Sequence, residues 1–195
     1  MAMTPALVLA SSSPYRHELL ERLGVPFESY KPEVDETPAN GEAPNEYVRR
    51  LALEKAQAIA RIVPRALIIG SDQVAVCDGA FLPKSGRPDV ALAQLAAISG
   101  RQVEFITGLC LLNSVAGTHQ LDTITFTVNF RPFSADEARR YMEKERPFNC
   151  AASFKSEGLG ITLVESLRGD DPTALIGLPL VRLAQMLRNE GVALP

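Results

Sequence analysis

The segment Ser11-Ser12-Ser13-Pro14-Tyr15-Arg16 combines three hydroxyls and a guanidinium in six residues. Ser13 is a favourable helix N-cap, and Pro14 suits the first helical position. A helix N-terminus presents unpaired N–H groups and a positive dipole end, so that Arg16 beside it would complete a phosphate site. An ordinary helix cap next to a surface arginine explains the same residues, and from these residues alone it is the commoner case.

A second segment, Pro32–Thr37, carries three carboxylates, Glu33, Asp35 and Glu36. Hard cations such as Mg²⁺ bind carboxylate oxygens together with substrate phosphates. A solvated acidic loop is the alternative interpretation, and this segment by itself does not decide between them.

Asp72 follows the apolar run Leu67–Gly70, which predicts a central strand that opens into Ser71-Asp72-Gln73. Ligands of open α/β sheets bind at strand ends, where a carboxylate can act as a base or hold a metal. An aspartate that caps a turn is the equally ordinary alternative.

The other candidates are weaker when taken singly. Lys55 and Lys84 would supply positive charge for phosphates, and the loop Phe154–Gly160 contains two glycines that permit close approach to a ligand. This loop has neither the dinucleotide nor the P-loop glycine spacing. The two histidines, His17 and His119, lie in a predicted helix and a predicted hairpin, which argues against a histidine-centred site. Carboxylates and lysines must therefore carry any chemistry.

The elements that would position these residues alternate between strands and helices in the first half of the chain. Apolar runs predict strands, and apolar residues at helical spacing between capping signals predict helices. We expect a strand over Ala6–Ala10, a helix over Pro14–Leu23 that ends before Gly24, a helix over about Asn45–Ile62, a strand over Leu67–Gly70, and a helix after Pro88 that carries Val90, Leu92, Leu95 and Ile98.

The second half changes its period. Thr123–Phe130 alternates polar and apolar residues, which predicts a half-buried strand paired antiparallel with Val103–Asn113 through Ala116-Gly117. The residues Ser134 and Glu137 form a capping box for a helix to about Lys144, and a last helix runs from about Pro179 to Gly191. Strand–helix units combined with a hairpin predict an α/β protein with α+β features and a mixed sheet.

The composition bounds the function without naming it. Twenty basic against 23 acidic residues, among 195, leave no basic excess for a nucleic-acid backbone. The cysteines Cys77, Cys110 and Cys150 are scattered and odd in number, so we expect free thiols in a reducing compartment. We expect no signal peptide and no membrane span, and hence a cytoplasmic location.

Taken together and in order, the motifs resemble the Maf-like nucleoside triphosphate pyrophosphatases. Agreement with one motif would mean little, but eight in order across nearly the whole chain are specific. They are Ala10–Leu20 (ASSSPYRHELL), Glu33–Glu36 (EVDE), Glu54–Ala56 (EKA), Gly70–Gln73 (GSDQ), Lys84, Ser99–Gly100, Thr107–Gly108 and Gly177–Pro179 (GLP).

The resemblance implies a single Maf-like domain over residues 1–195, with a two-lobed fold similar to inosine triphosphatases and an active-site cleft between the lobes. It implies hydrolysis of a nucleoside triphosphate to a monophosphate and diphosphate, aided by Mg²⁺ or Mn²⁺. The implied roles are Asp72 as catalytic base and metal ligand, Glu33 as a second metal ligand, and Ser13, Arg16, Lys55 and Lys84 as phosphate-binding residues.

At three positions this sequence differs from most of the family, and its residues there resemble those of the members that act on 7-methyl-GTP. Tyr15 replaces the first of two arginines, Gln73 replaces a threonine, and Glu157 replaces a glutamine. A 7-methylated guanine carries a delocalised positive charge, which favours an aromatic face and a nearby carboxylate. We therefore assign these three residues to base selection.

Two other functions remain open at this stage. A sibling pyrophosphatase would act on another nucleotide such as dTTP or UTP, and a non-catalytic regulator of cell division would bind a partner. The expected partner is a small nucleotide rather than a nucleic acid or a membrane, and the sequence leaves open whether the chain forms a homodimer.

Overall fold

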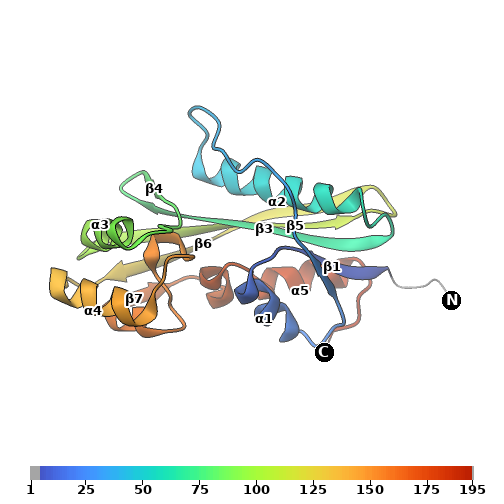
Figure 1. Cartoon of the computed structure of the whole chain (residues 1–195). Helices are drawn as coiled ribbons and strands as arrows, with labels where there is room; N and C mark the ends of the chain where they lie inside the picture. Colours follow the sequence, from blue (N-terminus) through green and yellow to red (C-terminus); the bar gives the residue numbers. More distant parts are fainter. Residues whose placement is uncertain (1–4, 195) are drawn as a thin grey trace.

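A seven-stranded mixed sheet forms the centre of the protein (Figure 1). The computed structural model describes residues 5–194, so that the first four residues and the last residue of the predicted domain lie outside it. The strand order is β2-β1-β3-β5-β6-β7, and β4 pairs with β3 beside this path. The strands are β1 (Ala6–Ala10), β2 (Glu28–Tyr30), β3 (Ala66–Cys77), β4 (Ala80–Leu82), β5 (Gln102–Asn113), β6 (Thr118–Phe130) and β7 (Val164–Arg168).

Strand direction divides the sheet into two parts. β1 pairs parallel with β2 and with β3, whereas β3, β5, β6 and β7 pair antiparallel. Parallel neighbours require crossover connections, which the helices between them provide, and antiparallel neighbours permit the hairpin of β5 and β6. The predicted α/β class with a mixed sheet is confirmed.

The helices cover the sheet on both faces at one end and gather at the other end (Figure 1). α2 lies on one face, α1 and α5 lie on the opposite face, and α3 and α4 lie at the far end with β7. The α-helices are α1 (Pro14–Glu21), α2 (Pro44–Ala60), α3 (Pro88–Ile98), α4 (Ala135–Glu145) and α5 (Leu180–Asn189), and the 3₁₀ helices are η1 (Ala151–Ser153), η2 (Leu159–Leu163) and η3 (Pro172–Ile176).

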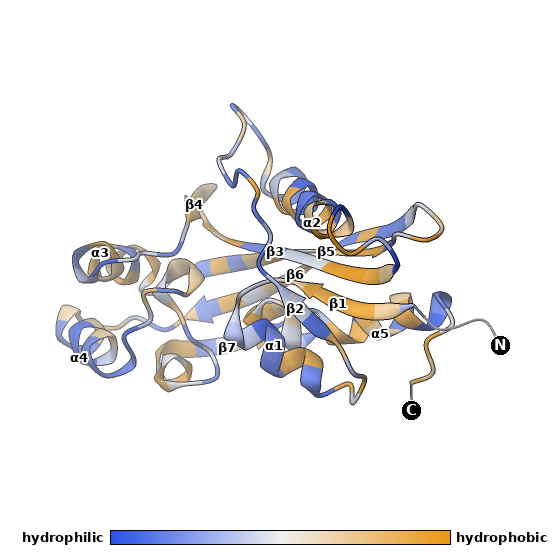
Figure 2. Ribbon diagram, turned by 45° about the vertical axis from the view of Figure 1, so that its right-hand side comes forward, coloured by the Kyte–Doolittle hydropathy of each residue, from blue (hydrophilic) through white to orange (hydrophobic). Residues whose placement is uncertain are grey.

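Separate hydrophobic clusters lie at the two ends of the sheet, which gives the protein two lobes. In the first lobe, α2 packs on one face of β1 and β3, and α1 and α5 pack on the other (Figure 2). In the second lobe, α3 and α4 pack against β5 and β6 around Phe105 and Phe130. The long strands β3, β5 and β6 connect the lobes.

The helix predictions agree with the structure within a few residues. Ser13 caps α1 by accepting the N–H of Arg16 at 3.4 Å, and Ser134 and Glu137 form both hydrogen bonds of the capping box. β2, β4 and β7 were not predicted, because strands of three to five residues leave little periodicity to detect. Among residues 5–194, no helix has the length and apolar character needed to cross a membrane.

The predicted end of the strand near Asp72 is wrong. β3 continues to Cys77, so Asp72 lies in its middle, paired with Gly108 of β5. The polar run does not end the strand, because β3 continues from one lobe to the other, and Asp72 and Gln73 line the space between them.

Two glycines let α2 lie close to the sheet at this crossing. A Cβ on Gly70 would collide with the carbonyl oxygen of Ala52, and a Cβ on Gly108 with that of Val48. Both strands therefore need glycine where the helix backbone passes. This close packing places Lys55 of α2 against Asp72 of β3.

Candidate active site

The space between the lobes consists of two adjoining cavities that share several lining residues. The first, here called the polar cavity, has a volume of about 340 Å³, and the second, the mixed cavity, of about 450 Å³. The polar cavity is lined mainly by Ser11, Ser12, Ser13, Arg16, Lys31, Glu36, Lys55, Lys84 and Asn149. The mixed cavity shares seven lining residues with the polar cavity, Tyr15 among them, and adds Tyr47, Asp72, Gln73, Phe81, Cys150, Phe154 and Glu157.

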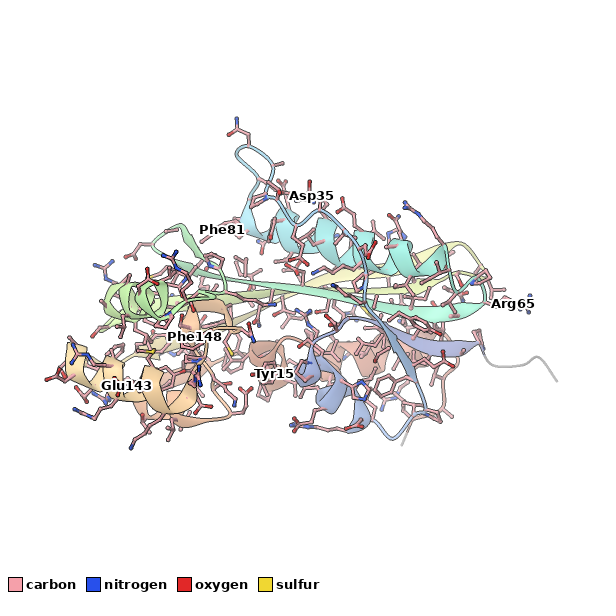
Figure 3. All side chains as sticks on the ribbon, in the orientation of Figure 1. Tyr15, Asp35, Arg65, Phe81, Glu143 and Phe148 are labelled. Atoms are coloured by element: carbon pink, nitrogen blue, oxygen red, sulfur yellow. The ribbon has the colours of Figure 1, made fainter. Side chains whose placement is uncertain are left out.

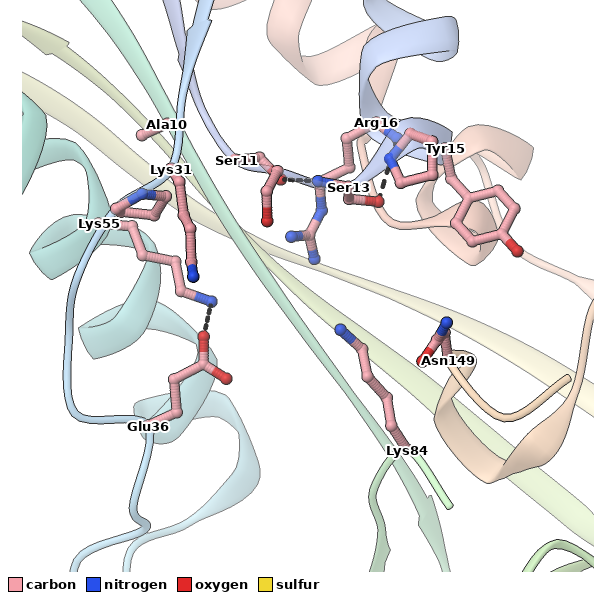
Figure 4. Close-up of a pocket in the computed structure, with 13 residues that line it drawn as sticks. Ala10, Ser11, Ser13, Tyr15, Arg16, Lys31, Glu36, Lys55, Lys84 and Asn149 are labelled. Atoms are coloured by element: carbon pink, nitrogen blue, oxygen red, sulfur yellow. Dashed lines mark hydrogen bonds and ion pairs between the residues drawn. The ribbon is translucent and has the colours of Figure 1, made fainter. Parts of the chain in front are cut away.

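Lys55 lies at the junction of the cavities and contacts two carboxylates. Its Nζ is 2.6 Å from Oδ1 of Asp72. The same Nζ is 2.7 Å from Oε1 of Glu36, a contact drawn in Figure 4. The side chains of Lys55 and Asp72 are buried, whereas that of Glu36 is 59% exposed. Partial burial opposes ionisation of Glu36, but the hydrogen bond and charge of Lys55 lower its pKa below the usual value.

One side of the Arg16 guanidinium is hydrogen-bonded to the backbone. Its Nε donates to the carbonyl of Gly177 at 2.8 Å, and the Ser71 hydroxyl donates to the same carbonyl at 2.9 Å. Figure 4 shows the rest of the guanidinium directed toward the ammonium of Lys84. Removal from water lowers the pKa of Arg16.

Lys84 faces Arg16 although both are positively charged. Loss of water lowers the pKa of Lys84 first, and the charge of Arg16 lowers it further. Two cations that face each other in this way favour an anion between them, and phosphate oxygens are acceptors of the right charge. The polar cavity thus has the electrostatics of a phosphate site.

Ser13 serves as a helix cap and also lines both cavities. Its oxygen accepts the N–H of Arg16, so the hydroxyl proton remains available to donate into the cavity. The two interpretations of this segment, cap and ligand site, are therefore compatible.

Aromatic side chains from both lobes line the mixed cavity, among them Tyr15 and Phe81, which Figure 3 labels. Tyr15 projects from the start of α1, and the Lys155 ammonium lies 5.9 Å from its ring centre. Across the cavity, the rings of Tyr47 and Phe81 lie 5.7 Å apart. Burial, and then the negative charge of Asp72, raise the pKa of Tyr47 to about 12, so this phenol stays neutral at physiological pH.

Gln73 contacts the cavity wall through its amide nitrogen. The Nε2 group donates to the carbonyls of Ala174 and Leu175 at 2.7 and 3.2 Å and to the Thr107 hydroxyl at 3.0 Å. These bonds fasten η3, whose residues Leu175 and Ile176 line the cavity. The proposed part of Gln73 in base selection would therefore include holding this wall in place.

The structure brings together all but one of the residues predicted for the site. Those that line the cavities are Ser13, Tyr15, Arg16, Lys55, Asp72, Gln73, Lys84 and Glu157. Glu33 is exposed and lies outside both cavities, whereas Glu36 from the same loop lines both of them. The extended loop turns successive side chains in different directions, and the sequence contained no signal to choose among its carboxylates.

The carboxylates of Glu36 and Asp72 fit a site for a divalent cation completed by a substrate. Among residues 5–194 there is no group of three or more histidine, cysteine or acidic side chains placed to hold a metal. Mg²⁺ commonly binds one or two carboxylates, with water and substrate phosphates as its other ligands. Both carboxylates now contact Lys55, beside the polar cavity, so the donor set agrees with that arrangement.

Sequence relatives match nearly the whole length of the chain. A 7-methyl-GTP pyrophosphatase of Pseudomonas aeruginosa is 53% identical over 191 residues, which cover 98% of this chain and 100% of the relative. A 7-methyl-GTP pyrophosphatase of Methylobacillus flagellatus is 50% identical over 188 residues, which cover 96% of this chain and 98% of the relative.

The family model described as "Maf-like protein" matches residues 6–190, from β1 to the end of α5. The match contains every residue of the two cavities. On this coverage and on the identity of its relatives, the chain belongs to the Maf family.

Proposed function

We propose that this protein hydrolyses 7-methyl-GTP to 7-methyl-GMP and diphosphate. The observation that carries the proposal is the continuity of the two cavities. A cationic cavity suited to phosphates opens into one that contains Tyr15 and Glu157, an aromatic ring and a carboxylate suited to a cationic base. The names of relatives that are 50–53% identical support the same substrate.

In this proposal the triphosphate lies in the polar cavity. Arg16 and Lys84 bind phosphate oxygens from opposite sides, Lys55 approaches from α2, and the Ser13 hydroxyl donates from the start of α1. Phosphoryl transfer depends on positioning and on neutralising charge, and these groups supply both. Phosphate binding would also relieve the repulsion between Arg16 and Lys84.

Asp72 accepts a proton from the attacking water. The water oxygen bonds to the α-phosphorus, the bond from that phosphorus to the bridging oxygen breaks, and diphosphate leaves with the bonding electrons. Lys55, 2.6 Å away, orients the Asp72 carboxylate. A divalent cation, Mg²⁺ or Mn²⁺, would be held by Asp72 and Glu36 and would neutralise charge on the phosphates.

We place this reaction in the cytoplasm. Cys77, Cys110 and Cys150 are all free thiols in the described structure, which is typical of a reducing compartment.

Assay of nucleotide hydrolysis tests the proposal directly. The protein is incubated with Mg²⁺ or Mn²⁺ and with 7-methyl-GTP, GTP, dTTP or UTP, and diphosphate and orthophosphate are measured separately. We expect diphosphate release, fastest from 7-methyl-GTP. Release of orthophosphate, or faster hydrolysis of dTTP or UTP, would contradict the proposal.

Replacing the base tests the catalytic assignment. Asp72→Asn keeps the size of the side chain but cannot accept the proton, so kcat should fall by about 10²- to 10⁴-fold. Asp78→Asn is the control, because Asp78 is 70% exposed at the turn after β3 and lies outside both cavities. Equal activity of the two variants would remove Asp72 as the base.

A further inference from the structure

A lysine lies beside both residues that we assign to recognition of a cationic base. Lys155 precedes Glu157 by two residues, and its ammonium is 5.9 Å from the centre of the Tyr15 ring. A protein cation at this place competes with a cationic base in two ways. The ammonium takes up space next to the Tyr15 ring, where the cationic base would lie. It would also neutralise the Glu157 carboxylate if the two formed an ion pair.

Lys155 forms its ion pair with a different carboxylate. Its Nζ lies 2.9 Å from Oε1 of Glu145, at the end of α4, and both side chains are largely buried. Glu157 instead accepts a hydrogen bond from the neighbouring Ser156 hydroxyl at 3.2 Å. The hydrogen bond with Glu145 raises the pKa of Lys155 and lowers that of Glu145, so both remain charged.

The Glu145 carboxylate is fixed by more than this ion pair. Its Oε2 accepts the N–H of Leu159 at 2.7 Å, which ties α4 to the loop that carries Glu157. Gly158 lies against the same carboxylate, and a Cβ there would come within 2.5 Å of it. The carboxylate therefore has a defined position on one side of the loop.

The backbone of Lys155 is held independently. Its N–H donates to the Tyr141 hydroxyl at 3.0 Å, and that hydroxyl donates to the carbonyl of Ser153 at 3.1 Å. Tyr141 is buried and belongs to α4, as Glu145 does. With the backbone fixed in this way, the position of the ammonium depends chiefly on which carboxylate attracts it.

The charges of Lys155 and Glu157 both act on Tyr15. Lys155 contributes one positive charge, and Glu145 and Glu157 contribute one negative charge each. The ion pair with Glu145 balances the charge of Lys155, so the charge of Glu157 is left for a cationic base.

From these contacts we infer that Glu145 is a positioning residue for base selection. It acts through Lys155: by binding the ammonium, it keeps Lys155 from forming an ion pair with Glu157, so that the Glu157 carboxylate is available to a 7-methylated guanine. The inference rests on the proposed function for its substrate. It adds a residue of α4, outside both cavities, to the determinants of specificity.

Three variants test the inference. Glu145→Gln keeps an acceptor for the Leu159 N–H but releases Lys155. The preference for the methylated base should then fall by about tenfold, as expected for one partly buried charge pair. Lys155→Met removes the competing cation and should leave the preference equal to or above that of the wild type. The double variant should behave like Lys155→Met, because without the lysine Glu145 has nothing to hold.

Two readouts separate the inference from the proposed function. Calorimetry measures the ratio of the dissociation constants of GMP and 7-methyl-GMP, which requires no turnover. Hydrolysis assays measure the ratio of kcat/KM for 7-methyl-GTP and GTP, with kcat for GTP expected to stay near the wild-type value. Glu143→Gln is the control, since Glu143 is an exposed carboxylate of the same helix (Figure 3).

The inference is overturned if Glu145→Gln has the same ratio of dissociation constants for GMP and 7-methyl-GMP as the wild type. It is also overturned if the double variant does not return this ratio to that of Lys155→Met. Both outcomes hold whatever the hydrolysis assay gives. Absence of 7-methyl-GTP hydrolysis by the wild type overturns the proposed function alone, because the binding ratio still reports on Glu145. If Glu145→Gln does not fold, Lys155→Met decides, and a lower ratio than in the wild type contradicts the inference.

Discussion

At the scale of single residues, Lys55 organises the site by contacting two carboxylates at once. Asp72 comes from a strand and Glu36 from a loop, and both approach the same ammonium within 2.7 Å. A cation held between these carboxylates and a triphosphate must share them with Lys55. The contact with Glu36 is the more exposed one and is therefore the easier to exchange.

The choice between Glu36 and Glu33 can be tested through the metal requirement. We expect Glu36→Gln to raise the Mg²⁺ concentration needed for half-maximal hydrolysis by about tenfold, because one of two carboxylate donors is lost. Glu33→Gln is the matched control from the same loop and should leave this concentration unchanged. A larger effect of Glu33→Gln would restore the sequence-based assignment.

Base selection gives a second prediction for single residues. Tyr15→Ala removes the aromatic face, and Glu157→Gln removes the carboxylate while keeping its size. Each should reduce the preference for 7-methyl-GTP over GTP by about 1–2 kcal/mol, the value of a partly desolvated cation–π contact. The measurement is the ratio of kcat/KM for the two substrates. If neither variant changes it, the base is recognised by other groups.

At the scale of elements, the loop before α2 places Glu36 in the site. Arg50 of α2 anchors this loop by donating to both oxygens of Glu42, at 2.6 and 2.8 Å, and to the carbonyl of Thr37 at 3.2 Å. The Tyr47 hydroxyl adds a bond to the carbonyl of Glu36 at 2.9 Å. The position of the carboxylate that we propose as a metal ligand thus depends on contacts made by the first turns of a helix.

The contribution of the Arg50–Glu42 ion pair to the stability of the fold should depend on pH. Hydrogen bonds from Arg50, and then from the Ala39 N–H, lower the pKa of Glu42 from its usual 4.5 to about 2. A pKa that is lower in the folded than in the unfolded state stabilises the fold above about pH 4.5, and this contribution is lost as the pH falls toward 2. Glu42→Gln should therefore lower the melting temperature near neutral pH and have no effect near pH 2.

Thermal denaturation between pH 2 and pH 7 measures this difference. Glu104→Gln, which removes an exposed carboxylate of β5, is the control for the general loss of one negative charge. If the melting temperatures of wild type and Glu42→Gln differ by the same amount across this pH range, the ion pair of Glu42 and Arg50 is not the source of the difference.

Most elements were predictable because their signals are local. The Ser13 cap, the capping box of Ser134 and Glu137, and the alternation in Thr123–Phe130 each depend on neighbours within a few residues. The extent of β3 was not predictable, because whether its polar residues end the strand depends on β5, which pairs with Asp72 through Gly108. That partner lies 36 residues away in the chain.

At the scale of the whole molecule, the site exists because two lobes face each other across the long strands. Arg16 and Lys55 come from helices of the first lobe and Ser13 from the N-cap of α1, whereas Lys84, Asn149 and Glu157 come from segments near the second. A nucleotide in both cavities would therefore contact both lobes and link them.

Binding should accordingly stabilise the folded protein. An analogue of 7-methyl-GTP with carbon in place of the α,β-bridging oxygen cannot be cleaved. At 100 times its dissociation constant it should contribute about 2.7 kcal/mol. For a chain of this length this corresponds to a rise in melting temperature of about 5–10 °C. At the same concentration, 7-methylguanosine lacks phosphates and should give a smaller rise, whereas equal rises would contradict phosphate binding by the polar cavity.

The sequence by itself determined the elements, the family and the residue types that could do chemistry, because capping, periodicity and ordered motifs are properties of neighbouring residues. Only the tertiary structure decided which carboxylate of the acidic loop joins Lys55, why Asp72 lies within a strand, and which carboxylate pairs with Lys155. These depend on contacts between distant segments, such as the ion pair of Lys55 and Asp72 across 17 residues. Such contacts form only when packing brings the segments together, as the close approach of α2 to Gly70 does here.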